Sequence, residues 1–204
     1  MSKPLFIAKQ SGHPRGWFGH IVAHVMARET AAANRTAREL LTIEPGDAVL
    51  EVGFGHGQTA YEIVCDVPTA TVAGVDPSEV MVRVARRKTR GHRDRVDLQQ
   101  GAVEDLPFDD NTFDKALGVH TTYFWPSLDA GLREVRRTLR PGGRFVLGFR
   151  PADDDFAAAT LPVSVYSLHT VEEMRTALVE AGFANVTTHR MDLTRGFIVW
   201  AVCS

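Results

Sequence analysis

Short apolar runs alternate along the chain with segments in which apolar residues recur every three or four positions. Short runs bounded by glycine, proline or aspartate are typical of buried strands, and the wider spacing is typical of amphipathic helices. Their regular alternation predicts a mostly parallel sheet covered by helices. The predicted strands are Ala48–Val52, Thr71–Val75, Val96–Gln99, Phe113–Val119, Arg144–Phe149, Asn185–Met191 and Gly196–Cys203.

The connections between these strands decide the topology. Only a few residues separate the last two strands, which predicts an antiparallel hairpin, because a parallel crossover needs a dozen or more residues. The sequence therefore predicts an α/β fold with a Rossmann-like, doubly wound, mostly parallel seven-stranded sheet and one antiparallel strand near the C-terminus. Helices are predicted from Gly57 to Cys65, Ser78 to Arg87, Leu128 to Leu139 and Thr170 to Gly182, and a loop from Arg150 to Leu168.

The first 45 residues contain no predicted strand. Phe18, Ile21 and Val25 recur at helical spacing, and Pro45 ends this N-terminal helical segment. A chain of 204 residues has the length of one domain. We expect a single domain, with a helical segment over 1–45 and an α/β core over 46–204.

Composition excludes several classes of protein. With 44% hydrophobic and 24% charged residues, the chain is neither disordered nor collagen-like nor a coiled coil. No apolar stretch reaches the ~18 residues of a membrane span, and the N-terminal apolar run is too short for a signal peptide. Cys65 and Cys203 form no disulfide framework, which indicates a reducing compartment. We expect a cytoplasmic protein without integral membrane association.

One stretch is strongly basic, although the formal net charge is −2. Nucleic acid or an anionic lipid surface could bind such a run. No aromatic residues are interleaved for base stacking, so nucleic acid is not the predicted partner. A solvated helix face or an oligomer contact, such as a homodimer interface, is favoured. The run consists of Arg83, Arg86, Arg87, Lys88, Arg90, Arg93 and Arg95, opposed by Asp94.

A glycine-rich turn follows the first predicted strand. Gly53, Gly55 and Gly57 stand between that strand and the next predicted helix. Glycine is needed where the backbone takes a positive φ or approaches a ligand, and the helix N-terminus directs its N–H groups to the same place. Asp76 ends the second strand nineteen residues after Gly57, where a carboxylate reaches ribose hydroxyls in nucleotide-binding α/β folds. The pattern predicts a nucleotide-like ligand.

The residues around the glycines separate the classes of nucleotide site. The dinucleotide pattern G-x-G-x-x-G needs its third glycine at position 58, where this chain has Gln58. No Lys-Ser/Thr pair follows the turn, so the Walker pattern is absent. The Glu51 carboxylate would repel a diphosphate, but it would attract a ligand with an amino group and a sulfonium.

Four motifs follow one another in a fixed order. This series resembles the motifs of the class I S-adenosylmethionine (SAM)-dependent methyltransferases, most closely their small single-domain, quinone-biosynthesis-like branch. The resemblance covers about residues 45–200 and implies SAM as the cofactor, S-adenosylhomocysteine as the product, and a helical cap over 1–45. The motifs are Glu51-x-Gly53-x-Gly55-x-Gly57, Gly74-Val-Asp76-Pro-Ser78-x-x-Met81, Glu104-Asp-Leu-Pro107-Phe108 with Asp114, and Leu139-Arg-Pro141-Gly142-Gly143.

The resemblance also implies roles for individual residues. Glu51 would orient the methionine amino group, Asp76 would hold the ribose hydroxyls, and Met81 would pack on the adenine. Family members often carry an acid where this chain has Ala102, so backbone groups, Glu104 or Asp105 would contact the adenine. The cofactor-binding residues implied are Glu51, Gly53, Gly55, Gly57, Asp76, Pro77, Ser78, Met81, Gly101, Ala102, Val103 and His120.

The methyl acceptor is expected at the carboxyl end of the fourth strand. Because a sulfonium already activates the methyl group, the enzyme mainly aligns a nucleophile for in-line displacement. A hydroxyl nucleophile is helped by a general base, and His120 and Tyr123 stand at this strand end. They are the candidate catalytic residues, with His120 as the candidate base. The alternative is that His120 is hydrogen-bonded and only shapes the pocket.

Two further segments could contact the substrate, namely the N-terminal segment and the loop after the fifth strand. His20 and His24 share a helix face but lack a third ligand, so no metal site is predicted. The aspartates 153–155 could receive a cationic substrate, although solvated loop charges are favoured. The candidate substrate-binding residues are His13, Trp17, His20, Tyr123, Trp125, Tyr166 and His169.

The sequence predicts a SAM-dependent methyltransferase acting on a small-molecule acceptor, with a sugar or natural-product hydroxyl as the favoured class. One alternative is methylation of a lipid headgroup or quinone at a membrane surface. Others are a non-catalytic SAM-binding module and a nicotinamide oxidoreductase, which Gln58 and Glu51 disfavour.

Overall fold

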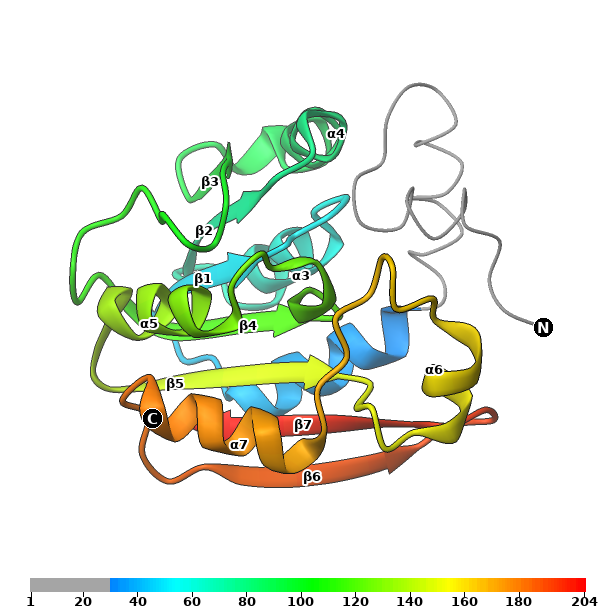
Figure 1. Ribbon diagram of the computed structural model, residues 1–204. Coiled ribbons are helices and arrows are strands. Elements are labelled where there is room, and N and C mark those ends of the chain that lie inside the picture. The colour runs from blue at the N-terminus through cyan, green and yellow to red at the C-terminus, as the bar shows by residue number, and fades with distance from the viewer. Residues whose placement is uncertain (1–29) are drawn as a thin grey trace.

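A computed structural model describes residues 30–204 of the protein. Its centre is a seven-stranded sheet with the order β3-β2-β1-β4-β5-β7-β6 (Figure 1). Neighbouring strands among β1 to β5 are parallel, and β7 runs antiparallel to both β5 and β6. This confirms the predicted doubly wound sheet. The strands are β1 (Ala48–Val52), β2 (Thr71–Asp76), β3 (Val96–Gln100), β4 (Phe113–Val119), β5 (Leu139–Phe149), β6 (Thr187–Asp192) and β7 (Phe197–Cys203).

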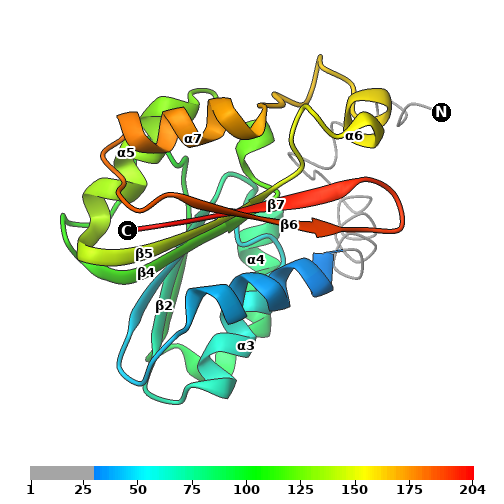
Figure 2. The same cartoon turned by 90° about the horizontal axis from the view of Figure 1, so that it is seen from below.

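Helices cover both faces of the sheet. The helix over 30–41 lies with α3 and α4 on one face, and α5 and α7 cover the other (Figure 2). Two turns of 3₁₀ helix, η1 and η2, follow α4 and β4. The bounds are α3 (Gln58–Asp66), α4 (Glu79–Lys88), η1 (Arg90–His92), η2 (Thr122–Phe124), α5 (Leu128–Thr138), α6 (Asp155–Thr160) and α7 (Val171–Glu180).

Side-chain caps fix where three of these helices begin. Ser78 accepts a hydrogen bond from the Met81 N–H at the start of α4, and Ser127 caps α5 in the same way. Thr170 and Glu173 form a reciprocal capping box at the start of α7. These caps satisfy N–H groups that have no partner within the helix.

The helix over 30–41 extends the apolar layer on its face of the sheet. Ala33, Ala37 and Leu41 recur every four residues and are buried in the same apolar cluster as Val49 and Trp200. This packing confirms the predicted N-terminal helix for the described part of the segment 1–45. It also brings residues 30 and 34 toward the carboxyl ends of the strands.

The segment after β5 was predicted to be a loop, but it contains the helix α6. Asp154 caps this helix by accepting from the Phe156 N–H, and it also accepts from the Phe197 N–H and the Arg150 guanidinium. Asp154 is only 2% exposed. It is therefore neither a solvated loop charge nor a receptor for a cationic substrate. Its carboxylate joins the end of β5 to the β6–β7 turn.

Candidate active site

A cavity opens at the carboxyl ends of β1, β2 and β4. The chain leaves β1 toward β2 on one side and has β4 as the neighbour on the other, so this is the point where the strand order reverses. Ligands of open α/β sheets bind at such points. The described residues that line the cavity are Thr30, Asn34, Glu51 to His56, Val75 to Pro77, Met81, Gly101 to Glu104, Val119 to Thr121, and Phe124 to Pro126.

The glycine-rich turn forms one wall of the cavity. Gly53 has φ +71°, and a Cβ added there would lie 2.3 Å from the Cγ2 of Thr121. Gly57 also has φ +71°, and an added Cβ would lie 2.7 Å from the Cβ of Ala85 in α4. The first glycine lets the end of β4 approach the turn, and the third lets α3 and α4 pack closely.

Glu51 places a carboxyl group in the wall beneath this turn. It is 5% exposed and accepts hydrogen bonds from the Thr59 side chain and the Ala60 backbone. Among residues 30–204, its Oε2 atom has no hydrogen-bond partner. Burial raises the pKa of Glu51 to about 8, which the two hydrogen bonds only partly oppose. An ionised Glu51 thus needs a cationic partner, which the cavity leaves room to bind.

Asp76, at the end of β2, is held rigidly in the same cavity. One carboxylate oxygen accepts from the Gly55 N–H and the other from the Ser78 N–H, both at 2.9 Å. Asp76 is 6% exposed. The turn and the N-terminus of α4 therefore fix the direction of this carboxylate.

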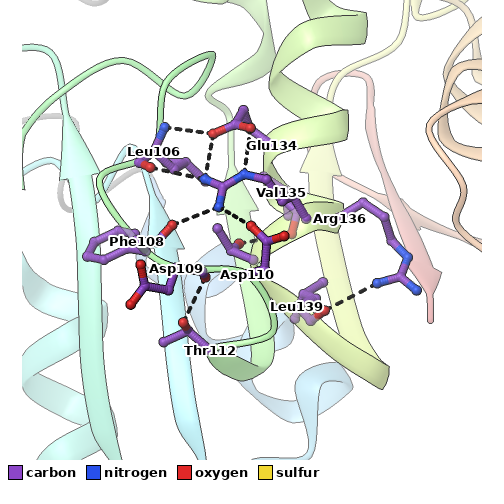
Figure 3. Close-up of polar contacts among 11 residues, drawn as sticks. Leu106, Phe108, Asp109, Asp110, Thr112, Glu134, Val135, Arg136 and Leu139 are labelled. Atoms are coloured by element: carbon purple, nitrogen blue, oxygen red, sulfur yellow. Dashed lines mark hydrogen bonds and ion pairs between the residues drawn. The ribbon is translucent and has the colours of Figure 1, made fainter.

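The loop after β3 lines the cavity with Gly101 to Glu104. Arg137 of α5 anchors the continuation of this loop, in which Figure 3 labels Leu106, Phe108 and Asp110. The guanidinium donates to the carbonyl oxygens of Leu106 and Phe108, to Asp110, and through two nitrogens to Glu134. Glu134 in turn accepts from the Leu106 N–H at 3.0 Å. The predicted motif that begins at Glu104 is thus tied by its backbone to α5.

We expect Arg137→Met to lower the free energy of unfolding by about 2 kcal/mol, because several charge-assisted hydrogen bonds are lost. Urea unfolding of the wild type and the variant measures this difference. Arg133→Met, on the same helix and paired with exposed Asp129, serves as the control and should change stability by less than about 0.5 kcal/mol.

The difference in stability between the wild type and Arg137→Met should also depend on pH. The Arg137 hydrogen bonds hold the pKa of Glu134 below its usual value. The stability that the pair contributes is therefore present above the usual glutamate pKa and is lost as the pH falls through the lowered value. A difference between wild type and Arg137→Met that does not shrink in acid would contradict this assignment.

The end of β4 brings His120 to the cavity. His120 has φ +57°, and its backbone N–H donates to the Gly148 carbonyl at 2.8 Å. Its Nδ1 atom lies 3.0 Å from the Tyr123 hydroxyl oxygen, which accepts a hydrogen bond from the Arg150 N–H. Tyr123 itself is buried, and burial raises the pKa of its hydroxyl.

Most of the predicted cofactor residues lie together around the cavity. The exceptions are Gly57, which packs against α4, and Ser78, which caps it. The lining residues among those predicted are Glu51, Gly53, Gly55, Asp76, Pro77, Met81, Gly101, Ala102, Val103 and His120.

The predicted substrate residues are more scattered. Trp125 lines the cavity, whereas Tyr123, Tyr166 and His169 do not. Tyr123 and Tyr166 pack against each other in the core, with ring centroids 5.8 Å apart. His13, Trp17 and His20 lie outside the described residues. Within residues 30–204, no group of three His, Cys, Asp or Glu side chains could hold a metal ion.

Sequence reasoning missed several lining residues, and Thr121 is the most informative of them. It is 9% exposed, and its hydroxyl oxygen is buried without a hydrogen-bond partner in the described part of the chain. A Cβ added at Gly118 would lie 3.2 Å from this oxygen. A threonine beside a candidate histidine carries no pattern of its own, so only the fold reveals its place. Asn34, Phe54 and His56 were missed for the same reason.

None of the helices in the described part of the chain is long and apolar enough to span a membrane.

Comparisons with known proteins place these features in a family. Residues 49–143 match a family model described as a methyltransferase domain. The uncharacterized methyltransferase YdaC of Bacillus subtilis is 30% identical over 135 residues, which are 66% of this chain and 74% of that protein. The fatty-acid O-methyltransferase of Mycolicibacterium smegmatis is 40% identical over 101 residues, covering 50% of this chain and 36% of that protein.

A solved structure shares the fold. The methyltransferase in complex with the Trm112 activator of Haloferax volcanii has a TM-score of 0.76 and 21% identity, over 100% of this chain and 98% of that one. At this identity the likeness concerns the fold alone. Together with the YdaC match and the methyltransferase domain, it shows that the chain belongs to the class I SAM-dependent methyltransferases.

Proposed function

We propose that this enzyme transfers the methyl group of SAM to an oxygen atom of a small-molecule acceptor. The observation that carries the proposal is the buried, unpartnered Oε2 of Glu51 in a cavity at the strand ends. The name of the fatty-acid O-methyltransferase relative supports oxygen as the acceptor atom. That relative is matched over 36% of its length, so its substrate is not transferred to this chain.

The described residues fit the cofactor. Glu51 would bind the amino group, because an ammonium next to its Oε2 supplies the cation that burial of this carboxylate requires. Asp76 would bind the ribose hydroxyls with oxygens that the turn has already oriented. Met81 and the loop from Gly101 to Glu104 would enclose the adenine. When bound, SAM supplies a methyl group activated by the sulfonium charge.

The remaining wall is suited to an acceptor that is mostly apolar. Phe124, Trp125 and Pro126 line the cavity beyond His120. They would exclude water from the methyl group, and His120 would contact the reacting oxygen. Specificity in this arrangement depends on positioning, because in-line displacement requires the nucleophile on the far side of the methyl carbon.

The membrane-surface alternative would use the apolar face of the N-terminal helix or the basic run over residues 83–95. Arg86 donates to the Leu98 carbonyl, Lys88 to the Gln58 side chain, and Arg95 to the Val64 carbonyl. These cations fasten α4 and η1 to the rest of the fold, so only part of the run is available to a surface. We therefore favour a small-molecule acceptor over a membrane surface, and the unpaired Cys65 and Cys203 support a cytoplasmic setting.

We expect Asp76→Ala to weaken S-adenosylhomocysteine binding by about 30-fold or more, because two oriented hydrogen bonds to the ribose are lost. Calorimetric titration measures the affinity, and transfer of label from the SAM methyl to fractionated cell extract measures the reaction. Asp97→Ala, an exposed aspartate on the neighbouring strand β3, is the control and should retain both. Unchanged affinity in Asp76→Ala would overturn the ribose assignment. Wild-type protein that binds S-adenosylhomocysteine and labels no fraction of the extract would favour the non-catalytic module.

A further inference from the structure

Gly131 stands in α5 at a position that helix formation does not favour for glycine. It is buried, and its N–H donates to the Ser127 carbonyl as that of an ordinary helical residue does. Its φ is not left-handed, so the backbone does not require a glycine here. Glycine is the poorest helix former after proline. The reason for this glycine must therefore lie in packing.

Two neighbouring side chains occupy the space that a side chain at Gly131 would need. A Cβ added there would lie 2.7 Å from Cε3 and 3.1 Å from Cζ3 of Trp125, and 2.9 Å from Cγ1 of Val103. Because these distances are measured from one point, the six-membered part of the indole and Val103 lie next to each other against α5. Both belong to the same buried apolar cluster.

The same corner of the cavity is also held by a hydrogen bond. Val103 belongs to the loop of Gly101 to Glu104, which lines the cavity together with Trp125. The Glu104 carboxylate accepts from the Ser127 N–H at 3.2 Å, next to the start of α5. The loop after β3, the segment after η2 and the first turns of α5 thus meet around Gly131.

We infer that Trp125 binds the adenine of the cofactor and that Gly131 is the positioning residue that seats its ring there. The inference rests on the proposed function, in which Met81 and the loop from Gly101 to Glu104 enclose the adenine. It replaces the acceptor contact predicted for Trp125, because a ring packed beside Val103 lies at the adenine end of the cavity.

An indole ring suits this ligand. Adenine is flat and has apolar faces, and contact of a base with an aromatic side chain changes affinity by about 5- to 100-fold. Trp125 is 9% exposed and packed against α5, so its ring is placed before the ligand arrives and little rotamer freedom is lost on binding. Met81 and Val103 are also buried and add apolar surface around the same ligand.

The first test compares the binding of two ligands to Trp125→Leu by calorimetric titration. S-adenosylhomocysteine is the whole product, whereas methylthioadenosine keeps its adenine and ribose and lacks its amino acid. We expect both affinities to fall about 10-fold or more, and Trp125→Phe, which keeps a ring, to lose about threefold or less. Glu51→Gln should weaken S-adenosylhomocysteine alone, since methylthioadenosine has no amino acid to contact it.

The outcomes of this test distinguish the inference from the proposed function. Unchanged affinities in Trp125→Leu, or a loss confined to S-adenosylhomocysteine, would overturn the adenine contact and leave the proposed function intact. A loss in Trp125→Phe as large as that in Trp125→Leu would also overturn it. Wild-type protein that binds neither ligand would overturn the proposed function, and the inference with it.

The second test asks whether Gly131 acts through Trp125. Gly131→Ala should weaken both ligands about 5- to 10-fold, because the added methyl group pushes the ring into the cavity. In the Trp125→Leu background the same change should cost about twofold or less, since only the contact with Val103 remains. Equal losses in both backgrounds would overturn the role of Gly131. The control is Gly91→Ala, where no atom of residues 30–204 lies within 4 Å of the added Cβ, and it should bind as the wild type does.

The third test is spectroscopic and does not depend on how well a variant packs. The emission of an indole ring is sensitive to a purine in contact with it, so saturating methylthioadenosine should change the tryptophan fluorescence of the wild type. The change should disappear in Trp125→Leu. No change in the wild type, or an equal change in both proteins, would overturn the inference.

Discussion

Glu51→Gln is expected to weaken S-adenosylhomocysteine binding on the order of 100-fold, because it removes the carboxylate that would pair with the amino group. The amide keeps the shape of the side chain, so the cavity itself should persist. Calorimetric titration at pH 8 gives the affinity directly. Glu79→Gln, an exposed glutamate in the first turn of α4, is the matched control and should bind as the wild type does.

The same variant should remove a pH dependence of binding. Because the pKa of Glu51 is raised to about 8, this carboxyl group is mostly protonated in the ligand-free protein at neutral pH. Ligand binding to the ionised form then releases a proton, so wild-type affinity should fall about tenfold for each pH unit below 8 and level off above it. An affinity that is equally strong at pH 6 and pH 8 would contradict this role of Glu51.

The affinity for the ligand should rise with pH, whereas the contribution of Glu51 to the stability of the ligand-free protein should fall as the pH rises. The folded state binds the Glu51 proton more tightly than the unfolded state, in which the pKa is near 4.5. Folding stability therefore decreases as the pH rises from about 4.5 to about 8. Thermal unfolding over this pH range should show the decrease in stability that Glu51 causes in the wild type, and this decrease should be absent in Glu51→Gln.

The strand bounds that the sequence predicts best are those next to turn-forming residues such as Asp, Asn and Gly. The predicted bounds of β1 and β4 agree with the structure, since Asp47 and Gly53 delimit the first run and Asn111 precedes the second. β5 was predicted to begin at Arg144 but begins at Leu139, because Leu139 pairs with Phe113 across a register shift. Such pairing depends on a distant segment, which local pattern does not report.

The direction of each side chain explains why some predicted site residues line the cavity and others do not. Motif residues such as Glu51 and Asp76 are carried by strand ends, whose direction is set by the sheet, so their place follows from the sequence pattern. Tyr123 lies in the η2 turn, which directs its ring into the core and leaves the neighbouring Phe124 and Trp125 on the cavity. Nothing in the local sequence decides which of these three consecutive aromatic residues line the cavity.

Gly53→Ala is expected to lower the free energy of unfolding by about 3 kcal/mol, the largest effect on stability that we predict. A left-handed backbone at a non-glycine residue costs roughly 1–2 kcal/mol. The added methyl group also meets Thr121 Cγ2 at 2.3 Å, and relieving such overpacking costs a further 1–3 kcal/mol or so. Urea unfolding measures the sum.

Two further variants separate these contributions. Gly55→Ala shares the positive φ, but no atom of residues 30–204 lies within 4 Å of the added Cβ, so it should lose only about 1–2 kcal/mol. Thr121→Ser removes Cγ2 and keeps the hydroxyl, so combining it with Gly53→Ala should recover the steric part in a double-mutant cycle. Equal losses in Gly53→Ala and Gly55→Ala, without recovery by Thr121→Ser, would show that backbone conformation alone requires these glycines. Recovery would show that Gly53 is also needed so that the end of β4 can bring His120 and Thr121 against the turn.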